Sequence, residues 1–136
     1  MLIPAGLNDF EDFSPLPVGN YGFIIKEPAE VVPNTSEKTD IGGNLYTFIV
    51  FAEVVEGPQA GKRVRRQSSN RSKASRYFLR TFLEKIGVNI QDGGGFASED
   101  ILGRQFKAAV SERVYKDKDG NDKKAAELEV ESIVAI

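Results

Sequence analysis

Eight basic residues fall within nineteen consecutive positions of this chain, and no acidic residue interrupts them. The nearest acids on either side are Glu56 and Glu84, while the other 117 residues hold ten bases against twenty acids. A solvated surface usually mixes charges of both signs, so this segregation favours an anionic partner over a solvated basic loop and helix face. The eight residues are Lys62, Arg63, Arg65, Arg66, Arg71, Lys73, Arg76 and Arg80.

The composition excludes most catalytic chemistry. The chain has no cysteine and no histidine, so it lacks thiolate nucleophiles, disulfides, thiolate zinc sites and the commonest general base. We therefore predict a protein that is not an enzyme, with no catalytic residue, no metal site and no cofactor. A nuclease or junction enzyme that holds a metal ion with carboxylates remains as an alternative.

Two stretches have the look of ligand-binding loops but lack the residues that such loops need. Residues 57–63 have three residues between their glycines and an arginine after the lysine, whereas a phosphate-binding Walker loop has four residues and then Ser or Thr. Asp117, Asp119 and Asn121 have calcium-loop spacing, but Leu128 stands where the bidentate glutamate belongs. Both stretches are predicted to be turns.

The elements that must position the basic run follow from alternating apolar residues bounded by glycines. Residues 1–17 are predicted to be an arm, and residues 18–136 a single domain. A kink or an edge position is expected at Pro28, and residues 33–44 are expected to form a mobile hairpin connection. The predicted strands cover residues 21–32, 45–55, 62–67, 104–115 and 124–133, with one main helix over residues 73–86 between the third and fourth strands. This order is that of the OB-fold, an all-β, five-stranded Greek-key barrel.

The second and third strands bring bases beside aromatic rings. Because Glu53 shares a face with Thr47, Ile49 and Phe51, that face is placed outward. The opposite face is placed in the core, and it comprises Tyr46, Phe48, Val50, Ala52 and Val54. In the third strand, Val64 and Arg66 are predicted to face inward, and Arg63, Arg65 and Gln67 outward.

The helix and the last two strands follow the same logic. Ser72 is the expected N-cap, Gly87 ends the helix, and Ser98 caps a single helical turn. One stripe of the helix is predicted to pack in the core, and it comprises Phe78, Leu79, Phe82, Leu83 and Ile86. The cationic stripe comprises Lys73, Arg76, Tyr77 and Arg80. Inward positions of the last two strands are Phe106, Ala108, Val110, Val114, Leu128 and Val130, and outward positions include Lys107, Arg113 and Tyr115.

Charge and rings together are what a single nucleic-acid strand requires. Cations replace the counterions of its phosphates, and aromatic faces stack on unpaired bases of any sequence. The predicted DNA-binding residues are Thr47, Phe51, Lys62, Arg63, Arg65, Arg66, Arg71, Lys73, Arg76, Tyr77, Arg80, Lys107, Arg113 and Tyr115. Phe51 could equally be covered by the arm or by a second subunit, because interfaces also use exposed apolar strand faces.

The order of several short motifs carries a family resemblance. Residues 43–86, with the turn EGPQAGKR at 56–63 and the helix end FLEKIG at 82–87, resemble phage-encoded single-stranded DNA-binding proteins of replication and recombination cassettes. The sequence EDILGR at 99–104 is similar to that family too, and the resemblance covers most of residues 17–136. It implies an OB-fold protein that coats and protects single strands of any sequence during phage DNA replication and recombination.

The two ends of the chain bear on its partners. Many bacterial-type relatives finish in an acidic tail that recruits other proteins, whereas this chain finishes IVAI, so recruitment through such a tail is not expected. The acidic and aromatic residues from Asp9 to Phe13 are instead predicted to dock replication or recombination proteins. Alternatively, they rest on the groove formed by the clustered bases when DNA is absent. The alternative is that Phe10 and Phe13 pack on the barrel.

We expect single-stranded DNA as the main partner, and weaker RNA binding and homo-oligomers stay open. The chain has neither a signal peptide pattern nor a membrane-spanning apolar run, which favours the cytoplasm, namely that of the bacterial host if the protein is phage-encoded. An interaction module that docks an acidic protein is the alternative from another class.

Overall fold

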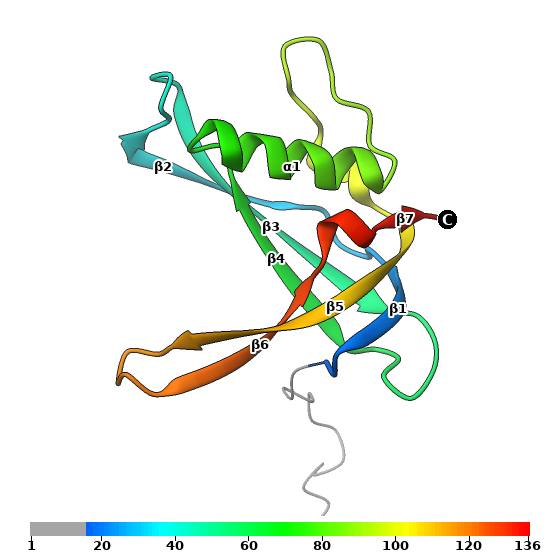
Figure 1. Cartoon of the computed structure of the whole chain (residues 1–136). Helices are drawn as coiled ribbons and strands as arrows, with labels where there is room; N and C mark the ends of the chain where they lie inside the picture. Colours follow the sequence, from blue (N-terminus) through cyan, green and yellow to red (C-terminus); the bar gives the residue numbers. More distant parts are fainter. Residues whose placement is uncertain (1–15) are drawn as a thin grey trace, which may run out of the picture.

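The computed structural model describes residues 16–136, so the predicted motif at residues 9–13 lies outside the described part of the chain. The described residues form seven strands, one α-helix and two short 3-10 helices (Figure 1). The strands are β1 (Gly19–Ile24), β2 (Glu30–Lys38), β3 (Asn44–Val54), β4 (Arg63–Ser69), β5 (Gln105–Lys116), β6 (Asp122–Leu128) and β7 (Val134–Ala135). The helix α1 spans Lys73–Lys85, and the 3-10 helices are η1 (Ser98–Ile101) and η2 (Val130–Ser132). The expected class, mainly β with one main helix, is confirmed.

The strands form one antiparallel sheet in the order β2-β3-β1-β5-β6, with β4 paired to β3 and β7 paired to β5. The long strand β3 has β2 along its first half and β1 at its end, while β4 runs along its other edge. Within the described residues, β4 and β6 each pair with one strand only. The sheet is therefore open between them.

The core holds α1 against the sheet with aromatic contacts. The rings of Phe23 and Phe106, from β1 and β5, stack 5.4 Å apart, and Phe82 of α1 meets Phe106 edge-on at 6.5 Å. Each of these three side chains is at most 1% exposed. Since burying a phenylalanine contributes about 1.5–3 kcal/mol, these rings fix where the basic helix lies.

The helix ends as the sequence predicts. The Ser72 hydroxyl accepts a hydrogen bond from the Ser75 backbone N–H at 3.2 Å, which makes Ser72 the N-cap. Gly87 follows the helix with φ +94°, a conformation that favours glycine, and Val88 N–H then donates to the Leu83 carbonyl. The predicted cap at Ser98 is wrong, because Ala97 precedes η1 and no side chain caps it.

The first predicted strand is in fact two strands, β1 and β2, separated around Pro28. The second of them runs on through residues that were expected to form a loop. Because β2 is an edge strand with mostly exposed side chains, no apolar alternation marks it. β2 is a strand because its backbone pairs with β3, with Val32 opposite Thr47.

The last predicted strand is also shorter than expected. β6 ends at Leu128, η2 follows, and β7 then pairs with the start of β5. Val130 is half-buried in η2 and still packs against the core. Val114, which was expected inside, is 58% exposed because the β5–β6 hairpin extends beyond the body of the sheet (Figure 1).

Candidate nucleic-acid interface

The pairing of β3 with β4 places the outward aromatic and apolar side chains of β3 beside the outward basic and polar side chains of β4. Residues directly opposite each other in an antiparallel pair share a face. Phe51 lies opposite Arg65 and Glu53 opposite Arg63, and the Arg63 guanidinium carbon lies 5.0 Å from the centre of the Phe51 ring. This arrangement agrees with the predicted faces. We call it the outer face, and it comprises Thr47, Ile49, Phe51, Arg63, Arg65 and Gln67.

Arg66 faces the other way, as its position next to Arg65 requires. Its guanidinium carbon lies 5.3 Å from the Phe82 ring centre, and its Nε is buried with no hydrogen-bond partner. Burial lowers the pKa of the Arg66 guanidinium, and the negative charge of Glu127 partly opposes that effect. Arg66 therefore packs beneath the sheet surface as a partly desolvated cation.

The opening between β4 and β6 forms a hollow of about 340 Å³, the β4–β6 hollow. Arg65, Arg66 and Gln67 line it from β4, and Arg113 lines it from β5. The Arg113 guanidinium carbon lies 5.4 Å from the Tyr115 ring centre. Arg113 thus lies across the hollow from Arg65, and the Tyr115 ring lies next to Arg113 on β5.

Several of the clustered bases are ion-paired with acids. Three of the acids precede β3 in the chain, and the fourth, Glu84, lies one turn further along α1. The pairs are Arg63–Glu27 at 3.9 Å, Arg71–Glu37 at 2.7 Å, Arg76–Asp40 at 2.7 Å and Arg80–Glu84. In the described part of the chain, Arg65, Lys73 and Arg113 have no ion pair. Counting charge along the sequence missed these pairings, because the partners of three of the arginines lie far away along the chain.

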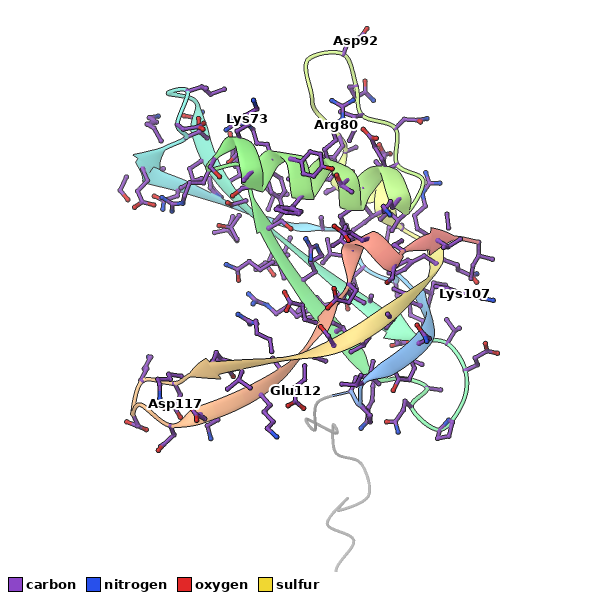
Figure 2. All side chains as sticks on the ribbon, in the orientation of Figure 1. Lys73, Arg80, Asp92, Lys107, Glu112 and Asp117 are labelled. Atoms are coloured by element: carbon purple, nitrogen blue, oxygen red, sulfur yellow. The ribbon has the colours of Figure 1, made fainter. Side chains whose placement is uncertain are left out.

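The predicted site residues do not all come together. Lys107 lies near β7, opposite Gly22 of β1 and Val134, whereas Lys73 and Arg80 lie on α1 (Figure 2). Along β5, Lys107 and Arg113 are separated by six residues, which is about 20 Å of strand. Lys62 directly precedes β4, at the Arg63 end of the outer face.

One aromatic residue of α1, Phe78, is not buried as predicted. Phe78, which was predicted to lie in the core, is 50% exposed, and its ring lies 5.5 Å from that of Tyr77, which is 64% exposed. The rest of the predicted packing stripe is confirmed, because the helix packs through Leu79, Phe82 and Leu83. Phe78 lines a hollow beside Ser75 and Val130, where the chain leaves β6 and enters η2.

Tyr46 and Phe48 lie on the inward face of β3 but are only half-buried, unlike Val50, Ala52 and Val54. Phe48 packs against the edge of the core, so the predicted inward direction of both side chains is correct but neither is fully buried. They face a cavity beneath α1 together with Phe96, a residue that the sequence reasoning did not consider.

The chain matches no protein-family model and no curated protein. Among residues 16–136, no three acidic side chains are close enough together to hold a metal ion. No helix in the same part of the chain has the length and apolar character needed to cross a membrane.

Proposed function

We propose that this protein binds single-stranded DNA without sequence preference through the outer face and the adjoining β4–β6 hollow. The observation that carries the proposal is the alignment of Phe51 with Arg65 across β3 and β4, with Arg63 over the ring. Guanidinium groups bind phosphates, and an aromatic face next to them stacks on an unpaired base. Arg113 lines the β4–β6 hollow and has the Tyr115 ring beside it, which is a second combination of a cation and a ring.

We further propose that the architecture is an OB-fold barrel that stays open between β4 and β6. The pairing supports this, because β1 lies between β3 and β5, the helix lies between β4 and β5, and β5 and β6 form a hairpin. In this description, β1 and β2 together are the first strand of the barrel. The resemblance to phage-encoded single-stranded DNA-binding proteins supports the same reading and a role in replication and recombination.

The proposal is tested by titrating a fluorescent oligo-dT with the purified protein and measuring anisotropy. Arg63→Glu with Arg65→Glu is expected to weaken binding about a hundredfold or more, because two charge-assisted contacts become repulsions. The melting temperature should change little, since both side chains are exposed.

Lys107→Glu is the control, because Lys107 is exposed and lies on β5, with β1 between it and β3. The double variant reverses two charges and the control one, so a loss of binding free energy in the control that is half that of the double variant would show that only net charge matters. Weak binding of oligo-dT by the unaltered protein would favour an acidic protein as the partner of this face. Duplex DNA and oligo-rU in the same assay measure the preference for single-stranded DNA.

A further inference from the structure

A second cavity, of about 560 Å³, lies between β3, α1 and the loop that follows the helix. Three aromatic side chains line it, namely Tyr46 and Phe48 from β3 and Phe96 from the loop. We call it the aromatic cavity. Its volume is within the range of small-ligand sites, and its lining, mostly apolar with a few polar groups, is typical of such sites.

The rings form a chain along the wall of the cavity. The Phe48 ring centre lies 5.6 Å from that of Phe96 and 6.3 Å from that of Tyr46. All three side chains are only half-buried, although Tyr46 and Phe48 point to the inward side of β3. Ring surface therefore remains uncovered inside a concave site, where another flat ring can stack on it.

Two arginines of α1 also line the aromatic cavity, and they differ in how firmly they are held. Arg76 donates to Asp40 at 2.7 Å and to the Asn70 carbonyl at 3.0 Å. Arg80 pairs with Glu84, one turn further along the helix, and both side chains are more than half exposed. An ion pair so open to water is weak, so a phosphate can take the place of Glu84.

The aromatic cavity lies on the inward side of β3, opposite the outer face, and the end of β4 borders it. Asn70, the residue after β4, lines the cavity and ties it to β3, because its side chain donates to the Asn44 carbonyl and accepts from the Tyr46 N–H. A DNA strand that follows β4 away from Arg65 on the outer face has to turn around the end of β4 at Asn70, near the start of α1, to enter the cavity. Its next base is then close to the cavity.

We propose that the aromatic cavity binds one nucleobase unstacked from the DNA strand, with the adjacent phosphate on Arg80. This inference rests on the proposed function, since the strand is delivered along the outer face. The lining fits a base with its phosphate, because the rings of Tyr46, Phe48 and Phe96 offer a stacking surface and the Arg80 guanidinium is only weakly paired. A free nucleotide has the same base and phosphate, so it would also fit the cavity.

The first test is cross-linking of the unaltered protein to oligo-dT that carries 4-thiothymidine, followed by peptide mapping. Cross-links at Tyr46 or Phe96, in addition to those on the outer face, are the expected result. Cross-links confined to Phe51 and Tyr115, with tight binding, would overturn the inference and leave the proposed function standing.

The second test uses substitutions read by oligo-dT affinity. Tyr46→Ala should weaken binding about tenfold through loss of stacking, whereas Tyr46→Phe keeps the ring and should bind as the unaltered protein does. Arg80→Gln should weaken binding, and Glu84→Gln should strengthen it by releasing Arg80. Equal affinities for all four variants would contradict the assignment.

A titration with free dTMP tells whether the cavity binds a base of the DNA strand or a free nucleotide. If dTMP raises the melting temperature and Tyr46→Ala abolishes that effect while oligo-dT does not bind, the cavity is a mononucleotide site, and both the strand assignment and the proposed function fail. If neither dTMP nor oligo-dT binds, both proposals also fail.

Discussion

At the scale of single residues, Asp40 shows how an acid far along the chain organises the basic run. Its carboxylate accepts one hydrogen bond from Arg76 and another from the Lys73 backbone N–H, at the start of α1. The Arg76 hydrogen bond, more than any other cause, holds the pKa of Asp40 below its usual value. Asp40 therefore fastens the β2–β3 turn to the helix.

A lowered pKa makes this contact dependent on pH. The unfolded chain binds a proton at Asp40 more readily than the folded chain, so the contribution to stability is complete above the unfolded value of 3.8. It is lost as the pH falls through the lower folded value. We expect Asp40→Asn to lower the melting temperature at pH 7 but to change it little at pH 2. A similar difference at both pH values would contradict this explanation.

Arg66 leads to a second prediction, because its charge is partly buried and its Nε lacks a partner. Replacing such a cation with an apolar residue of similar length is often neutral or stabilising. Arg66→Met should therefore keep or raise the melting temperature while packing on Phe82, and it should weaken oligo-dT binding less than Arg65→Met. A drop of about 5 °C or more, on the order of 1 kcal/mol, would show that the guanidinium stabilises the fold.

At the scale of elements, the β5–β6 hairpin carries one side of the proposed interface. Its outer part is exposed, and its tip is a polar turn in which the Asp117 carboxylate accepts from the N–H groups of Asp119 and Asn121. Such a turn forms without help from the rest of the protein. The hairpin can therefore present Tyr115 beyond the body of the sheet.

Shortening this hairpin tests its role. Arg113 and Ala125 are opposite each other, so replacing residues 114–124 with Asn-Gly should close a tight hairpin between them. We expect a nearly unchanged melting temperature, because the removed residues are mostly exposed, and about tenfold weaker binding of oligo-dT from the loss of one stacking ring. Tyr115→Ala in the full-length hairpin should reproduce most of that loss. Unchanged affinity in both variants would remove the hairpin from the interface.

At the scale of the whole molecule, the fold places acidic side chains from elsewhere in the chain beside the basic residues 62–80, a stretch that contains no acidic residue. Arg71 and Arg76 are paired at 2.7 Å, and Arg63 has a longer pair, so fewer cations are ready to meet phosphates than the sequence suggests. The cations best placed on the interface are Arg63, Arg65 and Arg113.

The salt dependence of binding measures this number. Three phosphate contacts on the outer face and the β4–β6 hollow predict a log-log slope of about −2 for a single strand, so fourfold more salt should weaken binding about twentyfold, and a fourth contact on Arg80 would bring the slope to about −2.8. If five of the eight clustered bases contacted phosphates, the slope would be about −3.5 and the loss about a hundredfold. A slope near zero would contradict phosphate binding, and a steep slope would mean that paired arginines exchange their acids for DNA.

Local features of this protein were determined by the sequence alone. The Ser72 cap, the helix end at Gly87 and the two faces of β3 and β4 were all predicted correctly. Each depends on a few neighbouring residues, through backbone conformation or a repeat of two or 3.6 positions, so the information is present in one short stretch.

Only the tertiary structure decided which of those residues meet. Arg76 and Asp40 are 36 positions apart, Phe78 is exposed where the chain leaves β6 and enters η2, and β2 exists because β3 offers it a free edge. The aromatic cavity likewise needs β3, α1 and the loop after the helix together. These features depend on strand register and on which element covers which. No local pattern encodes them, because the contacting residues lie far apart in the chain.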